Sequence, residues 1–250
     1  MRNIKLILEY DGTNYHGWQS QAGSGRPTIQ DRLEEALKAL TNEECKTNSS
    51  GRTDAGVHAF GHVAAFLTRS EIPSAAWAPA LNHHLPEDIR VLSSEEVHPG
   101  FHARYSALGK IYKYRILHRR EPTALYRNYT WHVNRRLNLR NMRLAAACLV
   151  GKHDFSAFRG SGCTARSPVR TLKRVDINKT GDFVDLWFEA DAFLQYMVRN
   201  LTGTLVEVGL GRFSPEEVQG MLKSRNRALA GRTAPPRGLY LVTVLYPEQI

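Results

Sequence analysis

The chain has 250 residues, of which 42% are hydrophobic and 23% are charged, and its formal net charge is +10 with a pI of about 9.7. This composition is typical of a folded globular protein rather than a disordered or membrane chain. Because a large basic excess favours polyanionic partners, nucleic acid is the leading candidate partner.

The chain shows no sign of a membrane or secreted protein. No apolar run is long enough to span a bilayer, and Lys5 and Glu9 interrupt the first apolar stretch, so it does not resemble a signal peptide. The three cysteines form no CxxC pair, so we predict neither a disulfide framework nor a zinc site. We therefore expect a cytoplasmic protein without membrane contact.

The first half of the chain is predicted to alternate strands and helices. A helix is expected after Thr28, a suitable N-cap, because an apolar stripe at helical spacing follows it: Ile29, Leu33, Leu37 and Leu40. The remaining predicted elements are strands over 4–10, 57–67 and 89–97, a short helix over 74–85, and a long glycine-rich loop over 11–27.

The second half continues this mixture, with few clean helical crossovers between strands. Its predicted elements are strands over 104–117, 170–178, 183–192 and 239–246, and helices over 138–150 and 194–210. We expect two α+β domains with largely antiparallel sheets, the first over 1–107 and the second over 108–250.

Asp54 lies in the stretch "GRTDAGVHA", where small, turn-prone residues surround an acid. Gly51 and Gly56 permit tight backbone geometry, and a nearby Arg52 would lower the pKa of the carboxyl and keep it ionised. An ionised carboxylate suits a nucleophile or a general base. The alternative is an Asp that fixes a turn by bonding to its own backbone, which the local sequence alone favours.

Basic residues alternate with aromatic ones between Lys110 and Trp131, a pattern that can neutralise phosphates and stack on bases. The alternative is an ordinary strand with a solvated basic face. A second basic cluster is predicted to form a phosphate-binding loop: Arg159, Arg166, Arg170, Lys173 and Arg174. The histidines lack acidic or thiol companions at ligand spacing, so no metal site is predicted.

Eight segments of the chain are distinctive: "EYDGTNYHGWQSQ", "TIQDRLEEAL", "GRTDAGVHA", "LNHHLPEDIRV", "FHARYSALGKIYKYRI", "GKHDFSAF", "FLQYMVRNLTG" and "APPRGLYL". Together, and in this order, they resemble the TruA family of tRNA pseudouridine synthases. The resemblance spans the chain from Leu6 to Tyr246. The departures from the family pattern are small. Ser50 stands where the family more often has alanine, and Gln195 and Tyr196 occupy positions that vary within the family.

The resemblance implies a fold and an activity. The fold would be two similar α/β-sandwich domains sharing an extended, mostly antiparallel sheet, with a catalytic cleft between them. The enzyme would isomerise uridine to pseudouridine at positions 38 to 40 of the tRNA anticodon stem-loop. It would work as a homodimer, through an interface in the second domain, and without cofactor or metal.

The resemblance also implies roles for individual residues. Asp54 would be the catalytic aspartate, attacking C1′ of the ribose, removing a proton from C2′, or attacking C6 of the base. Tyr112 and Arg199 complete the implied catalytic set, Arg199 by pairing with the aspartate. The implied substrate-binding residues are Arg52, His58, Tyr112 and Leu239. The alternatives are a catalytically silent RNA-binding module and, less consistent with the absence of paired acids, a nuclease or glycosidase.

Overall fold

The computed structural model describes residues 1–20 and 25–248, which form two compact units. The first comprises Met1–Leu108 with the chain from Tyr240 onward, and the second is Gly109–Leu239. We expected the second domain to continue to residue 250. The last strand instead belongs to the first unit from Tyr240 onward, because it pairs in parallel with a strand there, Tyr240 opposite His58 and Leu241 opposite Ala59.

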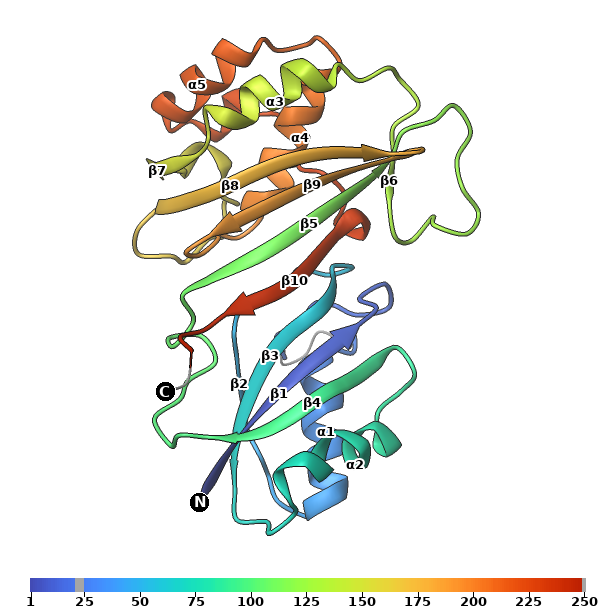
Figure 1. The fold of residues 1–250 in the computed structure, drawn as a ribbon, viewed down its shortest axis with the longest axis vertical. Helices are drawn as coiled ribbons and strands as arrows, with labels where there is room; N and C mark the ends of the chain where they lie inside the picture. Colours follow the sequence, from blue (N-terminus) through green and yellow to red (C-terminus); the bar gives the residue numbers. More distant parts are fainter. Residues whose placement is uncertain (21–24, 249–250) are drawn as a thin grey trace. The chain divides into compact units, whose positions relative to one another are not determined.

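In its described residues, the first unit is a sheet with two helices (Figure 1). Its strand order is β4-β1-β3-β10, with β2 also paired to β3, and all its pairings except β3 with β10 are antiparallel. The elements are β1 (Arg2–Tyr10), α1 (Ile29–Thr41), β2 (Thr47–Ser49), β3 (His58–Thr68), α2 (Trp77–His84), β4 (Ile89–Val97) and β10 (Leu239–Leu245).

Alternation and helical periodicity explain the core of this unit. Ile4, Leu6 and Leu8 on β1 are fully buried, as are Ile29, Leu33 and Leu37 on α1. The predicted N-cap is confirmed, since the Thr28 hydroxyl accepts a hydrogen bond from the backbone N–H of Asp31.

The second unit has the strand order β5-β9-β8-β7, all antiparallel, and β6 pairs in parallel with β5. Its three helices, α3, α4 and α5, gather beside this sheet (Figure 1). Both units therefore combine helices with a mostly antiparallel sheet, which confirms the α+β class. The elements are β5 (Gly109–Leu117), β6 (Trp131–His132), α3 (Leu139–Ala147), β7 (Gly151–Asp154), β8 (Val169–Thr180), β9 (Phe183–Ala190), α4 (Met197–Gly209) and α5 (Pro215–Ser224).

Helix α4 is the most buried helix of the second unit. All of its residues are buried except Arg199, which is partly exposed. We expected this helix to begin at residue 194, but it begins at Met197 because Tyr196 has a positive φ of 62°. Helix α5 was not predicted, although Ser214 and Glu217 form a capping box and Pro215 occupies the first turn.

The second basic cluster does not form one loop. Arg170, Lys173 and Arg174 lie on β8, which confirms the predicted strand over 170–178 and contradicts the predicted loop for these three residues. Arg174 lies 3.2 Å from Asp176 and 3.9 Å from Glu189. The predicted stacking of aromatic residues on bases is wrong for Tyr114 on β5, because Tyr114 is fully buried and donates its hydroxyl hydrogen to Pro235 O at 2.7 Å. Its ring is not accessible to a base.

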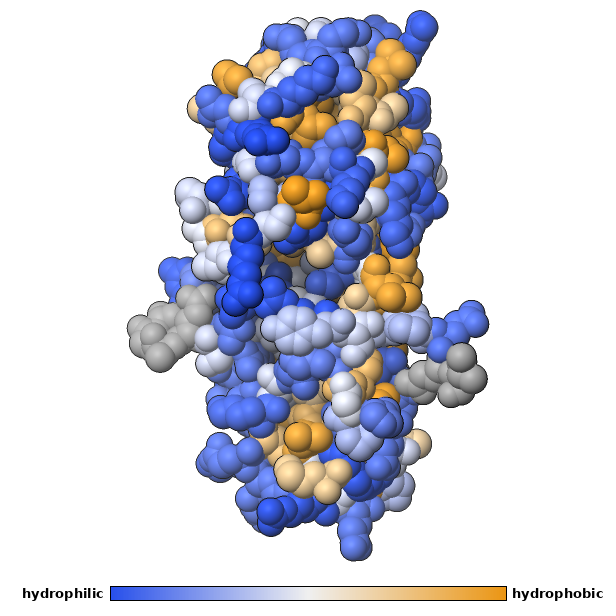
Figure 2. Space-filling view, turned by 90° about the vertical axis from the view of Figure 1, so that its left-hand side faces the viewer, coloured by the Kyte–Doolittle hydropathy of each residue, from blue (hydrophilic) through white to orange (hydrophobic). Residues whose placement is uncertain are grey.

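Charge is divided unequally between the units. Residues 109–239 contain 24 Lys and Arg against 10 Asp and Glu, whereas the remainder of the chain contains 10 against 14. Hydrophilic side chains cover most of the face in Figure 2, with smaller hydrophobic patches between them.

None of the helices in residues 1–20 and 25–248 combines the length and the apolar character of a membrane-spanning helix.

Two helical glycines provide a matched test of the packing around α4. A Cβ at Gly203 would lie 1.7 Å from Arg232 O, whereas a Cβ at the exposed Gly220 on α5 would meet nothing within 4 Å. We expect Gly203→Ala to lower the free energy of unfolding by about 3 kcal/mol. Gly220→Ala should raise it by about 0.5–1 kcal/mol through helix propensity. Urea unfolding followed by circular dichroism measures both, and wild-type stability of Gly203→Ala would contradict the close packing of Arg232 on α4.

Candidate active site

Asp54 lies in the loop between β2 and β3, as predicted, and is partly buried. Its backbone carbonyl accepts a hydrogen bond from Val57 N–H at 3.1 Å, which closes a tight turn in which Gly56 has a φ of 76°. Arg52, two residues earlier, is exposed, whereas Thr53 between them is buried. Asp54 therefore lies next to a buried residue, Thr53, in a tight turn of the loop.

The Asp54 loop packs against a second loop, formed by residues 11–20. Trp18 N–H donates to Thr53 O at 3.1 Å, and Gly56 N–H donates to Tyr15 O at 3.3 Å. A Cβ at Gly17, where φ is 86°, would lie 2.4 Å from Thr53 O. Glycine is therefore required at position 17 by both backbone conformation and the approach of the Asp54 loop.

A buried polar cluster holds Thr53 from its other side. The Tyr10 hydroxyl lies 2.8 Å from Thr53 Oγ1 and 3.3 Å from Nδ1 of His62, which is fully buried. The indole of Trp18 stacks on the His62 ring with a centroid separation of 3.9 Å. Thr53 thus has a backbone bond to one loop and a side-chain bond to β1, and these contacts restrict where Asp54 can move.

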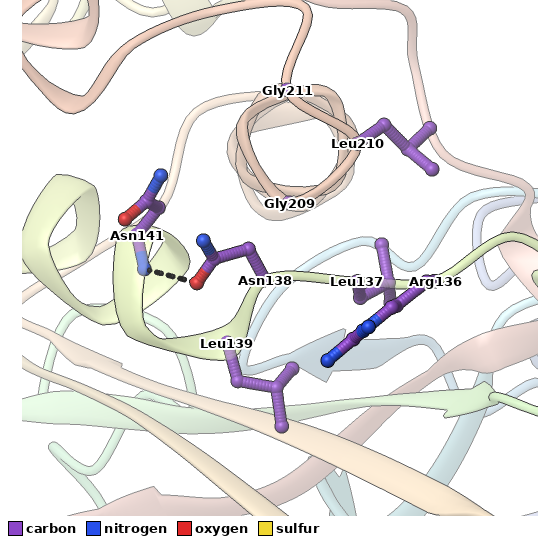
Figure 3. A pocket seen from close by; sticks show the side chains of 8 residues that line it. All are labelled: Arg136, Leu137, Asn138, Leu139, Asn141, Gly209, Leu210 and Gly211. Carbon is purple, nitrogen blue, oxygen red and sulfur yellow. Dashed lines mark hydrogen bonds between the residues drawn. The ribbon is translucent and has the colours of Figure 1, made fainter.

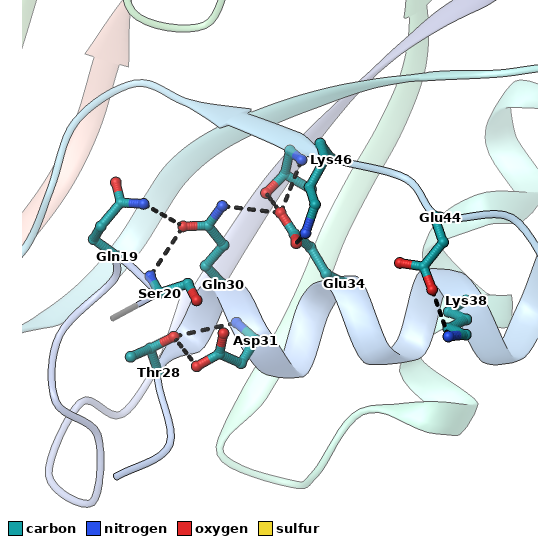
Figure 4. A network of polar contacts seen from close by, with 10 residues as sticks. Gln19, Ser20, Thr28, Gln30, Asp31, Glu34, Lys38, Glu44 and Lys46 are labelled. Carbon is teal, nitrogen blue, oxygen red and sulfur yellow. Dashed lines mark hydrogen bonds and ion pairs between the residues drawn. The ribbon is translucent and has the colours of Figure 1, made fainter. Parts of the chain in front are cut away.

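The 11–20 loop is itself tied to α1 (Figure 4). Gln30 Oε1 accepts hydrogen bonds from Gln19 Nε2 at 3.0 Å and Ser20 N–H at 3.1 Å, and Gln30 Nε2 donates to Glu34 at 2.9 Å. Burial alone would raise the pKa of Glu34, but hydrogen bonds from Thr47, Gln30 and Lys46 outweigh burial and lower it. This chain of contacts connects the 11–20 loop through α1 to the start of β2.

His58, a predicted substrate-binding residue, begins β3 and is buried. Its Nδ1 accepts a hydrogen bond from Gly12 N–H at 3.2 Å and lies 3.1 Å from Asp11 Oδ1. Its ring stacks on Tyr240 with a centroid separation of 5.0 Å. The structure therefore gives His58 contacts with the 11–20 loop and with β10.

The second unit holds the other three predicted residues on three different elements. Tyr112 on β5 is 8% exposed, with its ring edge-on to Phe193 at 5.0 Å. Arg199 lies in the first turn of α4, and its Nε donates to Ala234 O at 2.8 Å. Leu239, the first residue of β10, is 5% exposed.

The predicted residues are therefore distributed over both units, three in each. Arg52, Asp54 and His58 lie within seven consecutive positions of the first unit, whereas Tyr112, Arg199 and Leu239 are distant in sequence within the second. Sequence reasoning missed Tyr10, Thr53 and His62 as supports of the Asp54 loop. The only local signal for such a role was that Thr53 directly precedes Asp54 in the sequence.

The side chains offer acid–base and electrostatic chemistry. A partly exposed carboxylate can act as a nucleophile or base, a tyrosine hydroxyl can transfer a proton, and a guanidinium can stabilise an anion. Among residues 1–20 and 25–248, no group of three or more His, Cys, Asp or Glu side chains could hold a metal ion.

A cavity of about 580 Å³ lies at the C-terminal end of α4 (Figure 3). Its lining includes Leu137 and Asn138 before α3 and Gly209 to Gly211. Arg199 lies ten positions before Gly209, which corresponds to about 15 Å along a helix. The cavity is therefore separate from the candidate residue on the same helix.

Comparisons with known proteins agree with one another. A family model described as tRNA pseudouridine synthase matches residues 6–106 and 145–247. A protein named tRNA pseudouridine synthase A from Acetivibrio thermocellus is 49% identical over 246 residues, covering 98% of this chain and 100% of that protein. A protein of the same name from a Thermoanaerobacter species is 48% identical, and tRNA pseudouridine synthase A 2 from Clostridium perfringens is 47% identical, each with the same coverage.

A solved structure, of a Cbf5-Nop10-Gar1 complex, is a more distant match. It is 11% identical with a TM-score of 0.37, covering 95% of this chain and 57% of the matched chain. This similarity is too low to carry an argument about the present chain.

The hydrogen bond between Tyr10 and Thr53 can be tested by a double-mutant cycle. Thr53→Val and Tyr10→Phe each leave a buried polar atom without this partner, so each should lower the free energy of unfolding by about 1–3 kcal/mol. The double variant should lose less than the sum of the two single losses, by about 1 kcal/mol. Strictly additive losses in urea unfolding would show that the two hydroxyls are not coupled.

Proposed function

This chain belongs to the tRNA pseudouridine synthase family, and from that membership we propose that it converts uridine to pseudouridine at positions 38 to 40 of the tRNA anticodon stem-loop. The observation that carries the proposal is 49% identity to a tRNA pseudouridine synthase A over 98% of this chain. The two ranges matched by the family model include Asp54, Arg199 and Leu239, and Tyr112 lies between them.

The isomerisation needs only groups that protein side chains supply. The bond between C1′ and N1 of the uridine breaks, the uracil turns, and a new bond forms between C1′ and C5. The C5 proton leaves and N1 gains a proton, so there is no net redox change. We assign Asp54 as the essential group, with attack at C1′, proton removal from C2′ and attack at C6 as the three routes open to it.

The target uridine must leave the RNA stack before Asp54 can reach it. Flipping a base out costs a few kcal/mol, which phosphate contacts and stacking in the pocket must offset. In this proposal Tyr112 stacks on the extruded uracil, and Leu239 lines the pocket. Arg199 supplies the cation that pairs with the aspartate, and Arg52 and His58 contact the substrate.

The charge distribution supports RNA as the substrate. The second unit has 14 more basic than acidic residues, and such an excess attracts polyanions by counterion release. We further propose that the enzyme acts as a homodimer in the cytoplasm, with the second domain contributing the interface. These two assignments follow from the family resemblance and the composition.

Asp54→Asn should abolish isomerisation while leaving tRNA binding nearly unchanged, because the amide is similar in shape but is neither a nucleophile nor a base. Tritium release from [5-³H]uridine-labelled unmodified tRNA should fall by at least about 10⁴-fold. The matched control is Asp182→Asn, since Asp182 is exposed and lies 3.3 Å from Arg119 on the surface. It should retain wild-type activity.

The same assay separates the proposal from its main alternative. If the wild-type protein binds tRNA without releasing tritium from any tRNA, the chain is a catalytically silent RNA-binding module. If Asp54→Asn releases tritium at the wild-type rate, another residue carries the chemistry.

Tyr112→Phe tests whether the hydroxyl removes the C5 proton after the new bond has formed. The variant keeps the ring and its contact with Phe193, so tRNA binding should persist, but tritium release should slow by about 10²-fold. Tyr105→Phe is the matched control, because this exposed ring lies 4.4 Å from the His102 ring, centroid to centroid, and would keep that contact. An unaltered rate for Tyr112→Phe would restrict Tyr112 to stacking.

A further inference from the structure

Tyr196 has an unusual backbone conformation at the start of α4. Its φ of 62° and ψ of 0° place a large side chain in the left-handed region, and it makes no side-chain capping bond to the helix. Residues other than glycine rarely adopt this conformation, and such strained residues cluster at functional sites. The ring is partly exposed, with 37% of the residue accessible.

The neighbouring backbone holds Tyr196 in this conformation. Gly160 N–H donates to Gln195 O at 2.8 Å, and Asn200 N–H donates to Tyr196 O at 2.9 Å, so the chain is fixed on both sides of the strained residue. A Cβ at the buried Gly160 would lie 2.5 Å from Cδ2 of Tyr196. Gly160 therefore leaves the space that the ring occupies.

The Tyr196 ring contacts Arg199, the only residue of α4 that is not buried. The Arg199 Cζ lies 5.0 Å from the ring centroid, within the range of a cation–π interaction. Arg199 Nε donates to Ala234 O at 2.8 Å, and Ala234 N–H donates back to Arg199 O at 3.0 Å. A planar guanidinium that contacts a ring and also donates from Nε has little freedom in its last torsions.

We propose that Tyr196, with Gly160 behind it, is a positioning residue that fixes the orientation of the Arg199 guanidinium for the isomerisation reaction. The inference rests on the proposed function of Arg199 and adds to it the residue that holds the arginine in place. The strained backbone of Tyr196 directs its ring onto Arg199.

The critical variant is Tyr196→Gly, which relieves the strain and removes the ring. We expect its melting temperature to equal or exceed that of the wild type, whereas kcat falls by about 3- to 10-fold and KM for tRNA changes little. A residue with a purely structural role would not combine retained stability with a lower kcat. The conservative variant Tyr196→Phe should restore the activity, because it keeps the ring.

Asn42→Gly is the matched control for the relief of strain. Asn42 also has a positive φ, 57°, at the end of α1 in the first unit, so the glycine variant replaces a residue of the same backbone conformation without touching Arg199. It should be at least as stable as the wild type with an unaltered kcat. In an Arg199→Gln background, Tyr196→Gly should lower the single-turnover rate by less than about 2-fold, because the group it positions is gone.

The outcomes separate this inference from the function on which it rests. A wild-type kcat in Tyr196→Gly would overturn the positioning role. A raised KM with unaltered kcat would also overturn it, and would indicate that Tyr196 contacts the RNA directly. The same would follow if Tyr196→Gly lowered the rate by the same factor in the Arg199→Gln background as in the wild type. An inactive wild-type protein would instead refute the proposed function, and the inference with it.

Discussion

The packing of two loops around Thr53 is the constraint on which the candidate site depends. Thr53 is held by a backbone bond from Trp18 and a hydroxyl contact with Tyr10, and the adjoining residue is Asp54. The approach is so close that Gly17 has no room for a Cβ. A reactive acid needs a fixed position relative to its substrate, since a misplacement of about 1 Å can cost a factor of 10² in rate. In this chain, the buried cluster of Tyr10, Thr53 and His62 and the close approach of Gly17 to Thr53 fix the position of the loop that carries Asp54.

The second unit positions its candidate residue by different means. Helix α4 is buried along its length apart from Arg199, so packing fixes the helix while one side chain reaches the surface. Asn200, next along the helix, accepts hydrogen bonds from Arg227 and Thr233, and it donates to Phe158 O. A satisfied buried network of this kind resists displacement because every lost bond leaves a desolvated group. The first unit thus relies on loop contacts, and the second on a buried helix.

Local signals account for what the sequence predicted correctly. The alternation of Ile4, Leu6 and Leu8 and the cap at Thr28 act between near neighbours, so β1 and the start of α1 follow from them. The location of Asp54 in a loop was also predictable, but the residues alone left a simple turn as the alternative, and only the family resemblance favoured catalysis. Tyr10 and Thr53 are 43 positions apart, and no periodicity marks a buried hydroxyl contact. The positive φ of Tyr196 leaves no sequence signal, because it is tertiary contacts that hold a tyrosine in that region.

The unequal division of charge separates attraction of the substrate from its chemistry. The unit that holds Asp54 is net acidic, so its net charge opposes association with an RNA backbone, whereas the other unit has 24 basic residues against 10 acidic ones. Some of these cations are already neutralised, as Arg115 is by its two hydrogen bonds to Asp185, but 10 acids cannot neutralise 24 cations. Under the proposed function, the free energy of RNA association must come mainly from the second unit. Salt screens such charges over about 8–10 Å, so ionic strength should act on tRNA binding far more than on the step at Asp54.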